Sequence, residues 1–201
     1  MIQEFPVIYL ARHGETAWTI TGQHTGLTDL PLTARGECNA RRLGERLRGI
    51  AFGKVLTSPL LRARRTCELA GFGGAAETDR DLVEWDYGKY EGRLGSEIRA
   101  ERPGWQIFRD GAPGGESPQQ VAIRADRVIE RIRGVAGNVL VFSSGHFLRA
   151  LGSRWIGIDI VNARSLMLHT ASVSVLTYES SAEDRVIELW NDTHHLSRGD
   201  Q

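Results

Sequence analysis

The chain has 201 residues, with 25 basic and 25 acidic side chains that cancel at pH 7. This length is typical of one domain, which we expect to span residues 1–201, and the neutral balance excludes nucleic acid and anionic membranes as general partners. The first apolar run is too short to cross a bilayer and leads into Arg12 rather than a cleavage site, so we expect a cytoplasmic protein.

The N-terminal third of the chain predicts strands that alternate with helices. The apolar, β-branched run VIYL at 7–10 predicts a buried strand that ends in the turn RHG at 12–14. Helical periodicity over about 34–48 follows, and KVLTSP at 54–59 predicts a short strand that enters a helix at Leu60. The inward stripe of the helix over 34–48 is Ala40, Leu43 and Leu47.

The middle of the chain predicts loops followed by one long helix. Residues 72–116 are rich in glycine, proline and charge, so we expect long loops and short helices there. A helix should then begin after Ser117, with Pro118 at its first position and Gln120 completing a capping box. The core stripe of this helix is Val121, Ala125, Val128, Ile129 and Ile132.

The last third of the chain predicts three more strands. VLVF at 139–142 is a second buried run, followed at once by the turn SSGH at 143–146, and late strands are expected over 172–178 and 185–190. Strands that alternate with helices favour a three-layer α/β/α sandwich with a mostly parallel central sheet. The fold class is therefore α/β.

The two cysteines, Cys38 and Cys67, do not have the spacing of a zinc or redox site. Because both lie in segments with helical periodicity, we expect two buried, reduced thiols. The chain also lacks a GxxxxGK[ST] loop and an HExxH motif, which argues against P-loop nucleotide hydrolysis and zinc peptidase chemistry. The sequence implies no metal and no cofactor.

Ligand sites in open parallel sheets collect beyond the carboxyl ends of the strands, so His13 and the SSGH turn at 143–146 should meet in one crevice. Arginines near both turns, with more in SPLLRARRT at 58–66, would give this crevice the charge that a phosphate dianion needs. A histidine can attack phosphorus and hold the phosphoryl group covalently, which divides one difficult transfer into two easier steps.

Four ordered segments, ARHGETAW, SPLLRARRT, EWDYGKYEG and GHFLRAL, resemble the histidine phosphatase superfamily, also called the phosphoglycerate mutase-like family. The resemblance covers nearly the whole chain and implies a role for each matching residue. His13 would be the nucleophile, Arg12 and Arg62 would grip the phosphoryl oxygens, and Glu84 would protonate the leaving group and then activate water. If protonated Glu84 limits departure of the leaving group, activity should peak at mildly acidic pH.

One position departs from the family pattern. A second histidine usually precedes the glycine of the late turn, and Ser144 stands in its place. A serine hydroxyl donates one hydrogen bond but supplies no imidazolium charge, so stabilisation of the transition state should be weaker. Three interpretations stay open: His146 compensates, the enzyme is slow, or the chain binds phosphate without turnover. The first two are favoured because His13, Arg12, Arg62 and Glu84 are all present.

The segment GQHTGLTDLPLT at 22–33 resembles the sugar-bisphosphate and general phosphatase branch of the family more than the mutases. WQIFRDGAPGGES at 105–117 is similar to the branch that contains sedoheptulose bisphosphatases and acid phosphatases. We expect His24 either to line the mouth of the pocket or to lie exposed in its loop. We expect Arg149 to cap or pair near the turn at 143–146 rather than touch substrate. Trp18 should pack in the core or at the rim of the pocket rather than stack on a ligand. The expected substrate-binding set is Ser144, Thr19, Gln23, His24, Thr25, Tyr87 and Gly145.

The sequence thus predicts a metal-independent phosphatase that hydrolyses small phosphomonoesters, preferably a sugar phosphate or bisphosphate, through a phosphohistidine at His13. A phosphoglycerate mutase is the first alternative. A low-activity or non-catalytic phospholigand-binding relative is the second, because of Ser144. The partner is a small phosphorylated metabolite, and the oligomeric state is left open, with a homodimer as one arrangement.

Overall fold

A computed structural model describes residues 5–196 and places a six-stranded sheet at the centre of the chain. The strand order is β3-β2-β4-β1-β5-β6. Neighbours from β3 to β1 are parallel, whereas β5 runs antiparallel to both β1 and β6, so the predicted, mostly parallel sheet is confirmed with an antiparallel edge. The strands are β1 (Ile8–Arg12), β2 (Phe52–Thr57), β3 (Ala76–Thr78), β4 (Asn138–Ser143), β5 (Val173–Tyr178) and β6 (Arg185–Asp192).

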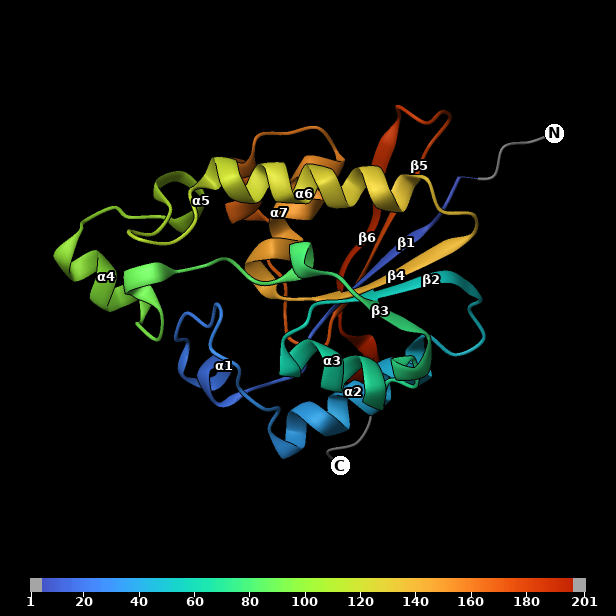
Figure 1. Ribbon diagram of the computed structural model, residues 1–201, viewed down its shortest axis with the longest axis horizontal. Coiled ribbons are helices and arrows are strands. Elements are labelled where there is room, and N and C mark those ends of the chain that lie inside the picture. The colour runs from blue at the N-terminus through green and yellow to red at the C-terminus, as the bar shows by residue number, and fades with distance from the viewer. Residues whose placement is uncertain (1–4, 197–201) are drawn as a thin grey trace.

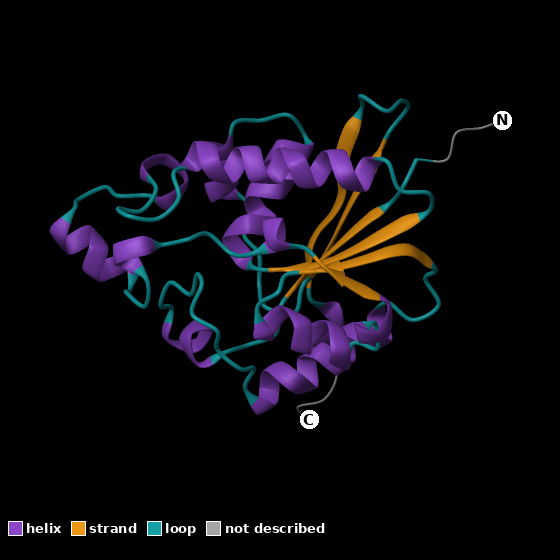
Figure 2. Cartoon of the chain, viewed as in Figure 1, coloured by secondary structure: helices purple, strands orange, loops and turns teal. Residues whose placement is uncertain are grey.

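Helices cover the sheet on both sides, which gives the expected three layers (Figure 1). The helices α6 and α7 lie over one face, and α2 and α3 lie over the other, with the strands fanned between them (Figure 2). The shorter helices α1 and α4 lie beyond one end of the sheet. The helices are α1 (Ala17–Thr21), α2 (Ala34–Arg46), α3 (Leu61–Leu69), α4 (Gly95–Glu101), α5 (Ile107–Asp110), α6 (Pro118–Arg133) and α7 (Gly145–Trp155).

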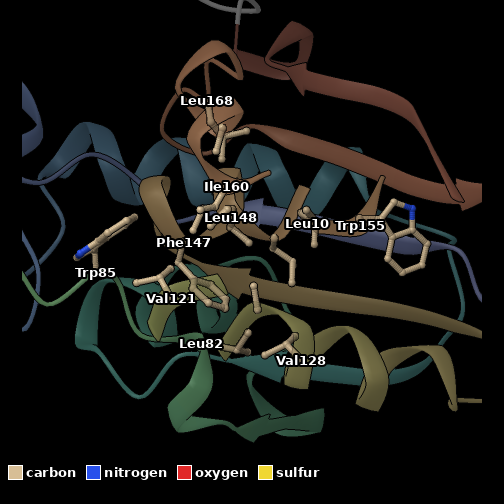
Figure 3. Close-up of a cluster of buried hydrophobic side chains, with 14 of the residues drawn as sticks. Leu10, Leu82, Trp85, Val121, Val128, Phe147, Leu148, Trp155, Ile160 and Leu168 are labelled. Atoms are coloured by element: carbon tan, nitrogen blue, oxygen red, sulfur yellow. The ribbon is translucent and has the colours of Figure 1, made fainter. Parts of the chain in front are cut away.

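The two central strands, β1 and β4, are apolar over most of their length because each strand packs against two cores. Side chains alternate across a strand, so Leu10 joins the cluster under α6 and α7, while its neighbour Ala11 joins the cluster under α2 and α3. Val141 and Phe142 of β4 divide in the same way. Figure 3 shows the larger cluster, in which Leu10 lies among side chains from α6 and α7. This packing on both faces fixes where β1 and β4 end.

The long helix α6 begins as its sequence predicts. The Ser117 hydroxyl accepts from the Gln120 amide, the Gln120 side chain accepts from the Ser117 amide, and Pro118 occupies the first turn. The whole predicted core stripe of α6 is buried. The expected inward stripe of the helix at 34–48 is also buried, although the helix itself ends at Arg46.

Other expectations need correction. Cys67 is buried as expected, but Cys38 is exposed, because it lies two positions before Ala40 and so points about 200° away from the buried stripe of α2. The segment 72–116 contains the expected loops and short helices, and also the unpredicted edge strand β3. Among residues 5–196, no helix has both the length and the hydropathy that a bilayer crossing requires.

Candidate active site

The turn at 12–14, which follows β1, is fixed to the neighbouring strand and to two helices. The amide of His13 donates to the Ser143 carbonyl at 2.9 Å, which holds the end of β1 beside the end of β4. The amide of Gly14 donates to the Thr66 hydroxyl of α3 at 2.9 Å. A Cβ at Gly14 would lie 2.6 Å from the Gly36 carbonyl oxygen of α2, so only glycine fits between these elements.

The ring of His13 is held in one orientation. Its Nδ1 lies 2.7 Å from the Gly14 carbonyl oxygen, which can only accept, so Nδ1 carries the hydrogen and a neutral ring keeps a lone pair on Nε2. Burial, and then the charges of Arg62 and Arg12, lower the pKa of His13 well below 6.5. The ring is therefore neutral near pH 7, which is the form that can attack phosphorus.

Arg12 projects from the last residue of β1 against the start of α7. One Nη1 hydrogen is donated to the Leu168 carbonyl at 2.5 Å, while Nε is buried and has no partner among the described residues. A Cβ at Gly145 would lie 3.1 Å from Cζ of Arg12, so the glycine leaves space for the guanidinium. Arg12 thus holds a cationic N–H group inside the site that nothing else in the described chain satisfies.

Arg62 is completely buried in the first turn of α3 and anchors a loop. Its Nη1 donates to the Thr28 carbonyl at 3.0 Å, and its Nη2 donates to the carbonyls of Thr25 and Gly26 at 3.0 and 2.8 Å. Its Nε is buried and has no partner among residues 5–196. The family resemblance implies that Arg62 grips the phosphoryl oxygens. In the structure, Arg62 also holds the loop at 25–28 through three hydrogen bonds.

Glu84 is fixed at the N-terminus of α7. Its Oε1 accepts from the amides of Trp85 and Phe147 at 2.9 and 2.8 Å, and its Oε2 accepts from the amide of His146 at 2.9 Å. These three backbone amides fix the position of the Glu84 carboxyl group. Arg124 of α6 holds the same segment by donating to the backbone carbonyls of Val83 and Glu84.

The turn at 143–146, between β4 and α7, contains an unusual combination of polar groups. Ser144 is fully buried, and its hydroxyl has no partner in the described chain. Two positions later, Nδ1 of His146 is in hydrogen-bond contact with the Tyr87 hydroxyl. Burial, then the charge of Glu84, raises the pKa of Tyr87 well above 10, and burial, then the charge of Arg149, lowers the pKa of His146 well below 6.5. Both groups are therefore neutral near pH 7.

His24 belongs to the same aromatic cluster rather than to an exposed loop. Its ring stacks on Tyr87, with centroids 4.7 Å apart and an interplanar angle of 29°, and it also contacts Trp105 and His146. Burial, and then the charge of Arg99, lowers the pKa of His24 to about 4. Of the two expectations for His24, the pocket position is confirmed.

These groups surround a cavity of about 670 Å³, which we call the main pocket. Most of the residues expected from sequence line it, whereas Arg62 and Ser144 are fully buried and are not among its lining residues. Arg149 pairs with backbone carbonyls as expected, and it also lines the pocket. Trp18 lines the pocket as well, which fits the expected packing at the rim. The lining residues are Arg12, His13, Trp18, Thr19, Gly22, Gln23, His24, Thr25, Glu84, Tyr87, Arg99, Gly145, His146, Arg149, Met167 and Leu168.

Sequence reasoning missed part of this lining. Arg149 comes one helical turn after His146, and this i, i+3 spacing was a usable signal. Arg99 and Met167 come from α4 and from the loop before β5, and no local pattern marks them. Among residues 5–196, no three His, Cys, Asp or Glu side chains are grouped so that they could hold a metal ion.

Comparison with known sequences agrees with this geometry. The family model described as "Histidine phosphatase superfamily (branch 1)" matches residues 8–193. Sedoheptulose 1,7-bisphosphatase of Saccharomyces cerevisiae is 39% identical over an alignment of 188 positions, and the match covers 77% of this chain and 69% of that protein. An acid phosphatase of Mycobacterium tuberculosis is 37% identical over 178 residues, which cover 86% of each chain.

Comparison with solved structures gives the same result. The product of an open reading frame from Mycobacterium tuberculosis superposes with a TM-score of 0.86 at 34% identity, covering 92% of this chain and 97% of that chain. The matched region includes both strand-end turns, the arginine of α3 and the glutamate that binds α7. The chain belongs to branch 1 of the histidine phosphatase superfamily.

Proposed function

We propose that this chain is a metal-independent phosphatase that hydrolyses small phosphomonoesters, such as a sugar phosphate or bisphosphate, through a phosphohistidine at His13. The observation that carries the proposal is the setting of that ring. His13 is buried, neutral and fixed through Nδ1, so its Nε2 lone pair is the available nucleophile. Arg12 and Arg62 each keep a buried Nε group that is unpaired in the described chain, and both charges act on the ring of His13 by lowering its pKa.

In the first step, Nε2 of His13 forms a bond to phosphorus while the bond from phosphorus to the ester oxygen breaks. The electron pair of that bond leaves with the ester oxygen, and the proton of the Glu84 carboxyl group neutralises it as an alcohol. The positive charges of Arg12 and Arg62 offset the charge on the transferring oxygens. The products of this step are phosphohistidine, free alcohol and the Glu84 carboxylate.

The hydrogen bonds of Glu84 indicate which oxygen carries the transferable proton. Oε1 accepts two backbone hydrogen bonds and Oε2 accepts only one, so Oε2 keeps the free lone pair. In the second step, Oε2 takes a proton from water, the water oxygen bonds to phosphorus, and the bond from phosphorus to His13 breaks. Inorganic phosphate leaves and Glu84 is protonated again.

Ser144 leaves this site without the usual second histidine, and we propose that His146 compensates in part. If the Tyr87 hydroxyl donates to Nδ1, the hydrogen of the neutral His146 ring stands on Nε2 as a donor. A neutral donor stabilises a developing negative charge less than an imidazolium does, so we expect a slow rather than an inactive enzyme. In this scheme Tyr87 is a positioning residue.

The test is phosphate release from a panel of sugar phosphates by the intact chain and by His13→Ala. We expect release by the parent chain, a rapid-quench mass spectrum that contains one phosphohistidine at residue 13, and no release by His13→Ala. His194→Ala is the matched control, because the His194 side chain is fully exposed. Release that survives in His13→Ala would overturn the proposal, and conversion of 3- to 2-phosphoglycerate without release would identify a mutase.

Ser144 is the specific observation that favours a second candidate, a phospholigand-binding protein without turnover. Its buried, unpaired hydroxyl could donate to a bound phosphate oxygen without adding charge. Phosphate binding with no release from any phosphoester, and no gain in Ser144→His, would support this candidate. A higher rate in Ser144→His would instead support the slow phosphatase.

The proposal also includes a cytoplasmic location and a small phosphorylated metabolite as the partner. Both cysteines are free thiols, as expected in a reducing compartment. A homodimer is the assembly to test, by size-exclusion chromatography with light scattering at several protein concentrations.

A further inference from the structure

A second cavity of about 480 Å³ adjoins the main pocket, and we call it the side arm. The two cavities lie side by side, because four residues line both of them: His24, Arg99, His146 and Arg149. The side arm extends away from His13 towards α4, α5 and the 3-10 helix Ile160–Ser165. Its remaining lining residues are Trp105, Gln106, Ile107, Phe108, Arg164 and Ser165.

The side arm is lined by three arginines and by no acidic side chain among the described residues. Arg99 comes from α4, Arg149 from α7 and Arg164 from the 3-10 helix, so three separate elements bring their charge to one place. The two histidines of the arm are neutral near pH 7, because burial is the largest cause that lowers the pKa of each one. The positive charge of the arm therefore comes from arginine and persists across the physiological pH range.

Arg149 is held so that part of its guanidinium stays available. Its Nε donates to the Ala163 carbonyl at 3.1 Å, its Nη2 donates to the Arg164 carbonyl at 2.9 Å, and the group lies over the Phe108 ring, 4.7 Å from the centroid. These contacts fix the orientation of the guanidinium and leave Nη1 without a partner among residues 5–196. A fixed guanidinium loses little side-chain entropy when it binds an anion.

Nearby arginines outside the arm behave differently. Arg93 pairs with Glu101, and Arg109 pairs with Asp110, both on the exposed side of this segment. In the part of the chain that the structure describes, neither Arg99 nor Arg164 is in an ion pair. Gly95 also leaves space for Arg99, since a Cβ there would lie 3.1 Å from Nη1. The charge of the arm is thus not neutralised by the protein itself.

We propose that the side arm binds a second anionic group of the substrate, a phosphate or a carboxylate, while the ester phosphate lies against His13. The substrate class is then a small phosphomonoester that carries a second anionic group. A sugar monophosphate whose ester phosphate is its only charged group is a poorer substrate. This inference rests on the proposed phosphatase function. It assigns a binding role to Arg99, Arg149 and Arg164, of which sequence reasoning had named only Arg149, and as a pairing residue.

The experiment compares kcat/KM for matched pairs of phosphoesters. Fructose 1,6-bisphosphate is set against fructose 1-phosphate, and 3-phosphoglycerate against glycerol 3-phosphate, so the first pair tests a second phosphate and the second pair a carboxylate. We expect the parent chain to prefer the doubly anionic member of at least one pair by roughly 10- to 100-fold, as one or two charge-assisted hydrogen bonds would give. Equal kcat/KM within both pairs would overturn the proposal.

Variants then connect the preference to the arm. Arg164→Gln and Arg99→Gln should each reduce the preference about 10-fold, chiefly through KM, and Arg164→Lys should restore part of it. Arg64→Gln is the control, because Arg64 is exposed on α3 and lines neither cavity. A preference that survives in both arm variants, or that falls equally in Arg64→Gln, would overturn the assignment. A chain that releases phosphate from no ester, including p-nitrophenyl phosphate, would contradict the proposed phosphatase function instead.

Discussion

Tyr87 and His146 are 59 positions apart in the sequence, and the tyrosine hydroxyl meets Nδ1 of the histidine inside the main pocket. Neither residue is charged near pH 7, so this contact selects a tautomer rather than forming an ion pair. It connects the segment after Glu84 to the first turn of α7, the two places from which the acid and the late turn come.

Removing that hydroxyl tests whether His146 takes part in the reaction. Tyr87→Phe should lower kcat about 10-fold, because His146 loses the hydrogen bond that fixes its Nε2–H form. Nitrogen-15 NMR of the histidine ring should show a single Nε2–H tautomer in the parent chain and a mixture in the variant. Tyr90→Phe is the control, since Tyr90 is a buried tyrosine of the same segment without a hydroxyl hydrogen bond in the described chain. An unchanged tautomer in Tyr87→Phe would contradict this role.

The pKa of His13 predicts the acidic side of the rate profile. In the proposed mechanism the neutral ring is the nucleophile, so protonation should remove activity. Burial, together with Arg62 and Arg12, lowers the pKa of His13 well below 6.5. The acidic limb of kcat/KM should therefore lie well below pH 6.5. Phosphate release measured from pH 4 to 9, and corrected for the second ionisation of the phosphoester near pH 6, checks this expectation. A limb at the ordinary histidine value of about 6.5 would contradict it.

The same histidines should make the fold less stable in acid. His13, His24 and His146 have lowered pKa values in the folded chain, so the unfolded chain binds more protons below about pH 6.5. Their contribution is complete above that pH and is lost as the pH falls, for His24 over the window from 6.5 to about 4. His24→Gln should therefore lower the slope of unfolding free energy against pH by up to about 1.4 kcal/mol per pH unit in that window.

Urea unfolding at pH values from 4.5 to 7.5 provides this measurement. His194→Gln is the control, because its side chain is fully exposed and should leave the slope unchanged. Equal slopes for the parent chain and His24→Gln would show that His24 is not held neutral by burial.

Replacing Arg62 should lower both the catalytic rate and the stability of the fold. Arg62→Gln removes a cation from the site and leaves the carbonyls of Thr25, Gly26 and Thr28 without their donors. We expect kcat to fall roughly 10²–10³-fold and the unfolding free energy to fall by about 3 kcal/mol or more. Phosphate release and urea unfolding measure the two effects, with Arg64→Gln as the exposed control. A variant that loses activity but keeps full stability would show that the loop does not depend on Arg62.

The close approach at Gly14 gives a test of the turn itself. Gly14→Ala would place a methyl group 2.6 Å from the Gly36 carbonyl, and we expect a loss of about 2 kcal/mol, or roughly 4–8 °C in Tm. Gly74→Ala is the matched control, because a Cβ at Gly74 meets nothing within 4 Å. Thermal unfolding of both variants decides the matter, and equal Tm values would contradict the contact.

Sequence reasoning succeeded where a signal was local. The runs at 7–10 and 139–142 are apolar at every position because β1 and β4 pack on both faces, and Ser117 begins α6 through hydrogen bonds to its own first turn. The turns at His13 and Ser144 follow from the same strands. Parallel pairing of β1 with β4 then brings them together, as the crevice argument requires.

Sequence reasoning failed where the position or role of a residue depends on partners that are distant in the sequence. Nothing near Arg62 in sequence shows that its guanidinium is used by the loop at 25–28, and nothing near Arg99 shows that α4 faces the side arm. The edge strand β3 is only three residues long, too short for a periodic pattern. Cys38 was misjudged for another reason, since helical periodicity was read without asking which face the residue occupies.

The attachment of Glu84 to the amides of Phe147 and His146 has a consequence for turnover. A carboxyl group tied to a helix end through both oxygens stays in place while its protonation changes, so donor and acceptor occupy one position in both half-reactions. In the proposed mechanism only substrate, alcohol, water and phosphate then need to move, and we expect no rotation of the Glu84 side chain to limit the rate.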